Sequence, residues 1–200
     1  MQKRTFSPKS VKKLDSSTKG DRPQLYYFSI LIQLGSVPNC TISYFCSMER
    51  TLVILKPCTI QRGLIGEVIS RFEKRGLKLV AMKMEQLTPE ILRQHYAHMV
   101  QKPFYPIIEK SMMAAPVVLC CWEGIDAVSV VREMAGATNG RKALPGTVRG
   151  DLCVSHQENI IHASDSLETA KAELERFFSP KDYCDYQSPL FDYLYAQDEL

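Results

Sequence analysis

The sequence predicts an α+β fold of the ferredoxin-like type: a four-stranded antiparallel sheet of split βαβ units with helices on its faces, plus a helical insert and a C-terminal extension. Two observations carry this prediction. From Met48 onward, short apolar runs rich in β-branched residues alternate with segments whose apolar residues recur at helical spacing. Their order is βα, β, a helical insert, βαβ and a last helix, which is a split βαβ layout.

The first half of this pattern runs from residue 51 to residue 113. Residues 51–55 (TLVIL) form a buried strand, and apolar residues at helical spacing over 64–72 predict a helix that ends near Gly76. Residues 77–84 form the second strand. Thr88 and Pro89 then start a helix as N-cap and first helical residue, and a short helix follows over 104–113.

The second half starts with a third strand over residues 117–122. A helix marked by apolar residues between 125 and 135 ends at Gly136, and a Gly- and Pro-bearing loop over 137–150 leads to a fourth strand near 152–155. The last amphipathic helix covers 167–178. Beyond it, residues 183–195 hold many aromatic and aliphatic side chains, which predicts that this extension packs against protein.

Residues 1–47 differ from the rest of the chain. They hold seven Lys or Arg and two Asp or Glu, so their net charge is +5. The whole chain has a net charge of +3, so residues 48–200 have a net charge of −2. Residues 1–23 have the composition of a disordered segment. The apolar stretch 25–34 is too short to span a bilayer, although it also fits the apolar part of a targeting signal. We therefore predict a poorly ordered extension over 1–47 and a folded domain over 48–200, with Met48 as a possible functional start.

Charge and cysteine content exclude several classes of protein. A body with a charge of −2 and no RNP-type aromatic motif argues against RNA recognition, and no membrane association is expected. The chain has an odd number of cysteines, seven, and no CxxC motif, so the cysteines indicate neither a disulfide framework nor a zinc site. This usage suits a reducing, cytoplasmic compartment.

The segment NIIHASDS, from Asn159 to Ser166, is the sharpest chemical feature. His162 precedes a predicted helix that Asp165 is expected to cap, with Glu168 completing a capping-box-like pair. Glu173 lies at the edge of the buried face of that helix. A carboxylate bound to one imidazole nitrogen fixes the tautomer and leaves the other nitrogen as a nucleophile. The alternatives are a structural histidine and a solvated glutamate.

Cationic and polar residues follow the strand ends where a triphosphate would need charge stabilisation. Lys56 ends the first strand, Arg132 lies on the helix after the third, and Thr138 and Arg149 flank the long loop. Phe104 offers an aromatic face for a base, or packs within the insert. The chain has no GxxxxGK[ST] loop and no HRD and DFG kinase motifs, so neither phosphate-binding arrangement applies.

These residues belong to a longer pattern that resembles the nucleoside diphosphate kinase family. NIIHASDS is similar to the family signature NxxH[GA]SD, and ERTLVILKP, HYAHM, KPFY, WEG, GATN and PGTVRGD follow in family order over about residues 48–196. The resemblance implies ping-pong transfer of the γ-phosphate of a nucleoside triphosphate, typically ATP, to a nucleoside diphosphate through a phosphohistidine. It also implies Mg²⁺ held mainly by nucleotide phosphates and water, without a dedicated set of protein ligands.

The resemblance assigns roles to ten residues. His162 is the implied nucleophile, oriented by Glu173, which Ser164 supports. Lys56 and Asn159 are expected to contact the sugar, and Lys56 also the phosphate. The phosphates are expected to be held by Tyr96, Arg132, Thr138 and Arg149. Phe104 is expected to stack on the base.

The chain departs from the family pattern at two positions. Cys58 stands where members commonly have Asp, and Gly140 stands where many have Pro in the long loop. The family resemblance further implies a homo-oligomer, a hexamer with a tetramer as the alternative. It also implies that the C-terminal extension lies on a neighbouring subunit, with packing on its own subunit as the alternative. A catalytically silent member and a ferredoxin-like binding module remain alternatives to the enzyme.

Overall fold

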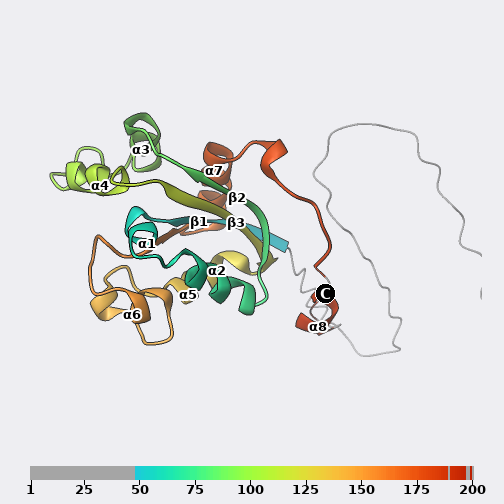
Figure 1. Cartoon of the computed structure of the whole chain (residues 1–200). Coiled ribbons are helices and arrows are strands. Elements are labelled where there is room, and N and C mark those ends of the chain that lie inside the picture. Colours follow the sequence, from blue (N-terminus) through green and yellow to red (C-terminus); the bar gives the residue numbers. More distant parts are fainter. Residues whose placement is uncertain (1–47, 189, 197–198, 200) are drawn as a thin grey trace, which may run out of the picture. The chain divides into compact units, whose positions relative to one another are not determined.

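The computed structural model describes residues 48–188, 190–196 and 199. The predictions for residues 1–47 therefore lie outside the described residues. Within the described part, no helix combines the length and the apolar character that a bilayer crossing requires. Strands and helices alternate as the sequence predicts, and they build one sheet with helices on both faces (Figure 1).

The sheet contains the four strands β1 (Met48–Leu55), β2 (Lys78–Glu85), β3 (Val117–Ile125) and β4 (Ile161–Ala163) in the order β2-β3-β1-β4. All neighbouring strands are antiparallel, with Val53 opposite both Cys120 and Ala163. β3 thus lies between β1 and β2, and β1 lies between β3 and β4. This is the predicted split βαβ arrangement, and the ferredoxin-like fold class is confirmed.

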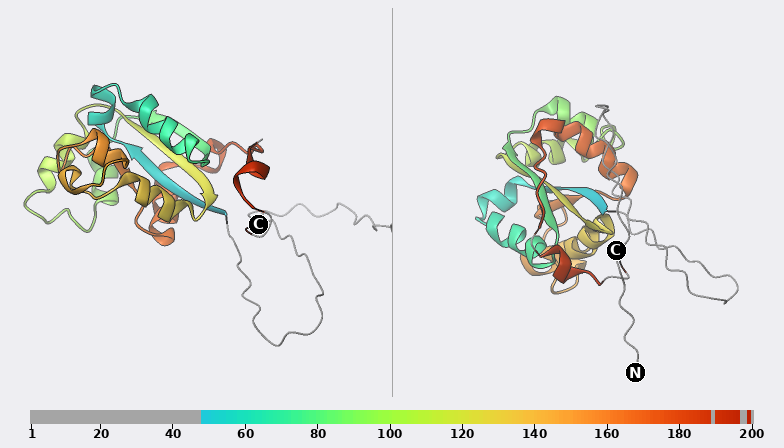
Figure 2. Two further views of the ribbon diagram at one scale, coloured as in Figure 1. Left: turned by 90° about the horizontal axis from the view of Figure 1, so that it is seen from below. Right: turned by 90° about the vertical axis from the view of Figure 1, so that its right-hand side faces the viewer.

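Helices cover the two faces of the sheet in separate groups (Figures 1 and 2). On one face, α2 (Ile65–Lys74) and α5 (Ala127–Ala135) bury a core around Phe72 and Trp122, whose ring centroids lie 5.3 Å apart. On the other face, α3 (Pro89–His95), α4 (Tyr105–Met112) and α7 (Leu167–Phe177) enclose a second core. Side chains that alternate along β1 feed the two cores in turn, Val53 the first and Ile54 the second.

The prediction of a strand near residues 152–155 was wrong. Thr147 accepts a hydrogen bond from the Gly150 amide and caps the short helix α6 (Val148–Leu152), and the fourth strand follows only at β4. The fourth strand is three residues long, so it offers too little alternation to be recognised in the sequence. His162 therefore lies inside a strand, opposite Ile54 of β1, rather than after one.

Several short elements complete the domain. They are α1 (Pro57–Gln61), the 3₁₀ turns η1 (Gly140–Lys142) and η2 (Pro180–Asp182), and α8 (Phe191–Leu194). Gly136 ends α5 as predicted, with φ 77°. A Cβ there would collide with the Thr147 side chain, so this position requires glycine for both conformation and space.

The C-terminal extension contacts its own subunit. The Cys184 amide donates a 2.7 Å hydrogen bond to Val80 O, and the Tyr186 hydroxyl donates one of 2.9 Å to Leu79 O. Farther along, the Tyr195 hydroxyl accepts from the Ile125 amide at 3.3 Å. These contacts lie within the chain, whereas Tyr193 remains 87% exposed.

Candidate functional site

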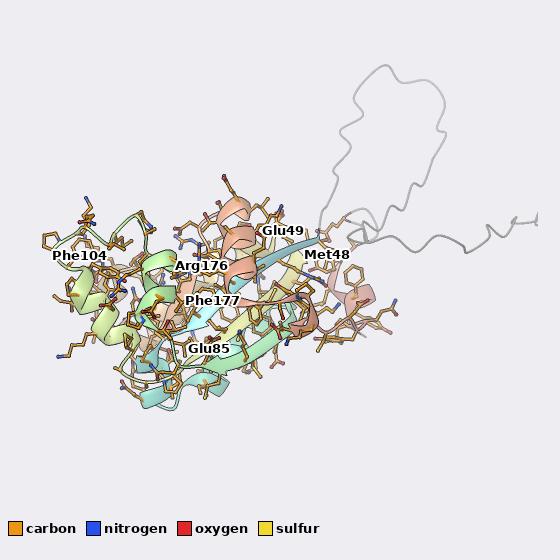
Figure 3. All side chains as sticks on the ribbon, turned by 90° about the horizontal axis from the view of Figure 1, so that it is seen from above. Met48, Glu49, Glu85, Phe104, Arg176 and Phe177 are labelled. Carbon is orange, nitrogen blue, oxygen red and sulfur yellow. The ribbon has the colours of Figure 1, made fainter. Side chains whose placement is uncertain are left out.

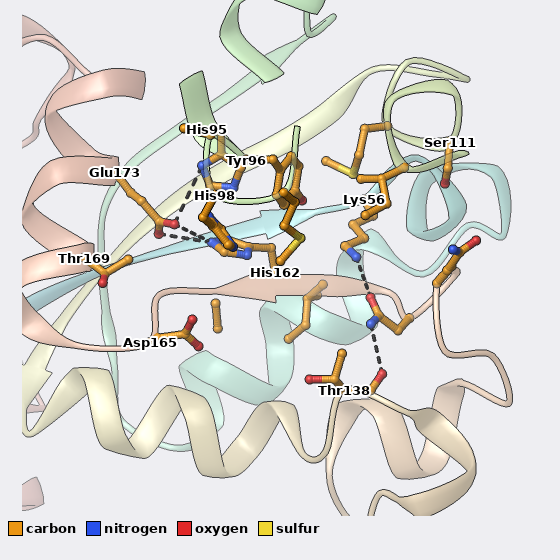
Figure 4. Close-up of a pocket in the computed structure, with 18 of the residues that line it drawn as sticks. Lys56, His95, Tyr96, His98, Ser111, Thr138, His162, Asp165, Thr169 and Glu173 are labelled. Carbon is orange, nitrogen blue, oxygen red and sulfur yellow. Dashed lines mark hydrogen bonds and ion pairs between the residues drawn. The ribbon is translucent and has the colours of Figure 1, made fainter. Parts of the chain in front are cut away.

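A cavity of about 880 Å³ opens between the helical insert, β4 and α7 (Figure 4). Nine of the ten residues singled out from the sequence line it, and the tenth, Ser164, contacts one of the nine. The nine are Lys56, Tyr96, Phe104, Arg132, Thr138, Arg149, Asn159, His162 and Glu173. Residues more than 100 positions apart in the chain thus meet at one end of the sheet.

His162 and Glu173 form the centre of this site. His162 Nε2 lies 2.9 Å from Glu173 Oε1 and 3.0 Å from Oε2, and the Ser164 hydroxyl donates to Oε2 at 2.6 Å. Burial alone would raise the pKa of Glu173, but the hydrogen bonds from His162 and Ser164 outweigh it and the pKa is lowered. The ionised carboxylate therefore holds Nε2 as a donor, which leaves His162 Nδ1 as the free nitrogen.

The start of α7 fixes the loop that follows His162, although not as the sequence suggested. Ser166, rather than Asp165, caps the helix by accepting a hydrogen bond from the Thr169 amide at 3.1 Å. The helix begins at Leu167 as expected, but its cap lies one residue later than Asp165, which instead pairs with Arg132 at 2.7 Å. The predicted capping by Asp165 and Glu168 was therefore wrong, and Asp165 is a direct neighbour of a candidate phosphate-binding cation.

Ile160 holds the segment before β4 in a strained conformation. Its φ is 72°, the left-handed region that β-branched residues rarely adopt. Its carbonyl accepts a 2.9 Å hydrogen bond from the Lys56 amide and another from the Thr59 hydroxyl. These bonds join the end of β1 to the segment that carries Asn159, so the strained residue connects two parts of the site.

Lys56 and Asn159 are joined directly. Lys56 Nζ donates to Asn159 Oδ1 at 2.6 Å, and Asn159 Nδ2 donates to Thr138 O at 2.9 Å (Figure 4). Burial, helped by the nearby charge of Arg149, lowers the pKa of Lys56 to about 8. The ammonium group is thus costly to keep charged until an anion joins it.

Arg149 occupies the floor of the cavity and is 4% exposed. Its guanidinium donates to three carbonyls, Gly136 O at 2.7 Å, Ile161 O at 2.7 Å and Asn159 O at 3.2 Å. Burial and the charge of Arg132 lower its pKa to about 10. Arg149 therefore ties the end of α5 to β4.

The two aromatic residues differ in their surroundings. Phe104 is 44% exposed on the helical insert, where its ring is accessible to a ligand (Figure 3). Tyr96 is 8% exposed and packs in the core between α3 and α7, and burial raises its pKa. Its hydroxyl therefore stays protonated and can act only as a neutral donor or acceptor.

The two departures from the family pattern have local explanations. Cys58 is buried in α1, and burial raises the pKa of its thiol, so it acts as a small apolar side chain rather than a charged one. At Gly140, a Cβ would collide with Cys153, and its amide donates to Ser155 O at 3.1 Å. A proline would lose that hydrogen bond, so this local packing favours glycine.

His95 is a site residue that the sequence reasoning missed. It ends α3, its side chain is 1% exposed, and its ring lies edge-on to His162 with centroids 4.6 Å apart. Burial and the neighbouring His162 lower its pKa to about 3, so it is neutral. A signal was present in the segment HYAHM, where His95 directly precedes Tyr96.

The nitrogen and oxygen ligand atoms of His95, His162 and Glu173 lie within 4.8 Å of one another, a donor set that Zn²⁺ accepts. Two features oppose a cation there. The His162–Glu173 pair is closed by a direct hydrogen bond, and the positive Arg176 lies 3.5 Å from His95 Nδ1. Mg²⁺, which prefers oxygen ligands, fits this imidazole-rich set poorly.

Comparison with known proteins gives consistent matches. The family model described as nucleoside diphosphate kinase matches residues 49–183. A nucleoside diphosphate kinase from Parabacteroides distasonis is 60% identical over 153 residues, and the match covers 76% of this chain and 100% of that protein. A nucleoside diphosphate kinase from Rhodopirellula baltica is 53% identical over 152 residues, with the same coverage of both chains. A nucleoside diphosphate kinase from Halobacterium salinarum, solved in complex with CDP, superposes with a TM-score of 0.73 at 36% identity, covering 75% and 100%.

Proposed function

Because the chain belongs to the nucleoside diphosphate kinase family, we propose that it transfers phosphoryl groups between nucleotides through a covalent intermediate on His162 Nδ1. The family function, phosphotransfer between nucleotides, makes the chain a transferase. The observation that carries the proposed nucleophile is the pair of contacts, 2.9 and 3.0 Å, between His162 Nε2 and the Glu173 carboxylate. They leave Nδ1 as the nitrogen with a free lone pair.

Two displacements complete the proposed cycle. His162 Nδ1 attacks the γ-phosphorus of a nucleoside triphosphate, the bond from phosphorus to the bridging oxygen breaks, and the nucleoside diphosphate leaves with that electron pair. A terminal oxygen of a second diphosphate then attacks the phosphorus, and the N–P bond breaks and restores His162. Glu173 stabilises the positive charge that develops on the imidazole in the first step.

Charge on the phosphates is the second requirement. Lys56, Arg132 and Arg149 line the same cavity as His162, and each can meet an anionic oxygen. Arg132 must first release Asp165. This ion pair is exposed, so breaking it costs little free energy. The lowered pKa of Lys56 implies that a bound phosphate increases its protonation.

Nucleotide recognition fits the outer part of the cavity. Phe104 presents an accessible ring for base stacking, which tolerates any base, and the Lys56–Asn159 pair can meet the sugar hydroxyls. Mg²⁺ would neutralise phosphate charge when it is bound with the nucleotide. Glu173 is taken by His162 and Ser164, which supports a cation held by phosphates and water rather than by this carboxylate.

Location and assembly are further parts of the proposal. The described cysteines are free thiols, and four of the five are buried, which supports a reducing, cytoplasmic location. We expect a homo-oligomer, a hexamer rather than a tetramer. The exposed Met82 and Met84 on the edge strand β2 and the exposed Leu144 and Val154 near η1 and α6 are apolar surfaces suited to subunit contacts.

The test is self-labelling with γ-labelled ATP. We expect the protein to acquire an acid-labile, base-stable label and to pass it to a nucleoside diphosphate. His162→Ala should abolish both reactions without changing the melting temperature by more than a few degrees, whereas His156→Ala, at an exposed histidine in the same cavity, should keep the label. Retained labelling in His162→Ala would reject the nucleophile, and no labelling of the unaltered protein would support a silent member or a binding module.

A further inference from the structure

Arg176 is a charged residue of α7 to which the proposed reaction assigns no role. It lies one helical turn beyond Glu173, between α7 and α3 (Figure 3), and it also lines the cavity. Its NH1 atom is 3.5 Å from His95 Nδ1. A guanidinium group only donates hydrogen bonds, so the nitrogen that it faces must be an acceptor.

This contact favours one of the two tautomers of His95. With Nδ1 accepting from Arg176, the proton resides on Nε2. Nε2 is buried and has no hydrogen-bond partner among the described residues. Burying an N–H group without a partner costs more free energy than burying an acceptor nitrogen without one. Without Arg176, His95 would therefore prefer the tautomer with its proton on Nδ1. The positive charge of Arg176 beside Nδ1 opposes that tautomer.

The tautomer matters because the same nitrogen faces Glu173. His95 Nδ1 lies 3.7 Å from Glu173 Oε1, the oxygen that contacts His162 Nε2 at 2.9 Å (Figure 4). A proton on Nδ1 would give Glu173 a second imidazole donor in competition with His162. A small rotation of the carboxylate toward His95 would then lengthen its bonds to His162.

The groups that act on His95 come from three elements. Glu173 and Arg176 reach it from α7, His162 from β4, and His98 from the turn after α3. Among them, Arg176 is the cationic group that contacts His95 Nδ1, at 3.5 Å.

We propose that Arg176 is a positioning residue that acts through His95. It keeps the His95 proton on Nε2 and away from Glu173, so that the carboxylate orients His162 without a competing donor. This inference rests on the proposed function of His162 and extends it to two residues outside the family signature. Arg176 need not touch the nucleotide for this effect.

The first measurement is the tautomer of His95. In the full-length protein labelled with ¹⁵N at histidine, long-range ¹H–¹⁵N spectra distinguish a ring protonated at Nε2 from one protonated at Nδ1. We expect Nε2–H in the unaltered protein and a shift toward Nδ1–H in Arg176→Gln. Arg176→Lys, which keeps a cationic donor, should restore Nε2–H. An unchanged tautomer in Arg176→Gln would overturn the proposal.

The second measurement is the single-turnover rate of His162 phosphorylation at saturating ATP. Arg176→Gln should lower it by about tenfold, because a competing donor on Glu173 would leave His162 less well oriented. Lys171→Gln, which removes a positive charge from an exposed position of the same helix, should leave the rate unchanged. An unchanged rate in Arg176→Gln would contradict the proposal.

A double-mutant cycle separates the proposed route from a direct effect of Arg176 on the nucleotide. In a His95→Phe background, which keeps a ring but removes both nitrogens, Arg176→Gln should change the rate less than twofold. An equal tenfold loss in both backgrounds would show that Arg176 acts on the phosphates and would overturn the proposal. If His162→Ala retained the label, the proposed function itself would fail, whatever the result for Arg176.

Discussion

Lys56 Nζ donates a 2.6 Å hydrogen bond to Asn159 Oδ1, which joins the end of β1 to the residue that lies three positions before His162. This bond crosses 103 residues of sequence and places a partly buried amine beside the strand that carries His162. The amine has a pKa of about 8 because burial and Arg149 disfavour its charged form. Its charge therefore changes within the working pH range of most enzymes, so we expect a measurable pH effect.

We predict that kcat/KM falls as the pH rises through about 8, because the free enzyme then loses the cation that meets the phosphate. Lys56→Arg should move this alkaline limb to higher pH, since a guanidinium stays charged, and Lys56→Met should lower kcat/KM by about 10²-fold at neutral pH. Steady-state rates between pH 6 and 10 check this prediction. Identical alkaline limbs in Lys56→Arg and the unaltered protein would contradict it.

The same lowered pKa of Lys56 predicts that the free energy of unfolding rises with pH, whereas kcat/KM falls. The folded-state pKa of Lys56 is below its unfolded value of 10.5, so between about pH 8 and 10.5 the unfolded chain binds more protons. The contribution of Lys56 to the free energy of unfolding is unfavourable below pH 8 and is relieved as the pH rises through this window. Urea unfolding of the unaltered protein and of Lys56→Met should therefore converge toward high pH.

Arg149 is predicted to serve both folding and catalysis. Arg149→Gln leaves up to three carbonyls without their charged donor, and we expect the free energy of unfolding to fall by about 3 kcal/mol or more. The folded fraction should also lose kcat/KM by about 10²-fold. Urea unfolding and rates normalised to folded protein separate the two effects. Normal rates per folded molecule would show that Arg149 is a structural residue alone.

Residues 1–47 are predicted to be dispensable. The chain that starts at Met48 keeps β1 whole, so it should retain the melting temperature and kcat of the full-length protein. Calorimetry and steady-state rates on the two chains make the comparison. A large drop in either quantity would mean that the extension packs on the domain. Secretion with cleavage would instead support a targeting signal.

The oligomer is predicted to be a hexamer, which light scattering on the full-length protein can count. A mass of four subunits would refute it. The contacts of Tyr186 and Tyr195 with their own subunit change what the C-terminal extension should do. Removing residues 190–200 should lower the free energy of unfolding by about 1–2 kcal/mol, because the Tyr195 contact and the packing of Leu194 on Gly76 are lost. We expect this loss of subunit stability to exceed any loss of stability of the oligomer toward dissociation.

The sequence by itself determined the order and type of most elements and the chemical identity of the site. Periodicity revealed β1 to β3 and the long helices, because each has enough residues to show an apolar face. The signature around His162, together with Glu173 at the edge of an apolar stripe, indicated the proposed nucleophile and the carboxylate that contacts it. Lys56 followed from its place at the end of the first strand, and Arg132 and Arg149 from the family resemblance and their positions on the helix and loop after the third strand.

Only the tertiary structure decided how these groups are held. β4 is defined by its pairing with β1 rather than by a pattern of its own, so its position emerged only in the sheet. The same is true of Ile160, whose strain depends on bonds to Lys56 and Thr59, and of Arg149, whose three carbonyl partners come from separate segments. His95 and Arg176 are 81 residues apart, and their contact depends on α3 and α7 packing on the same face of the sheet. Local sequence cannot encode such contacts, because they arise from distant segments that meet only when the chain folds.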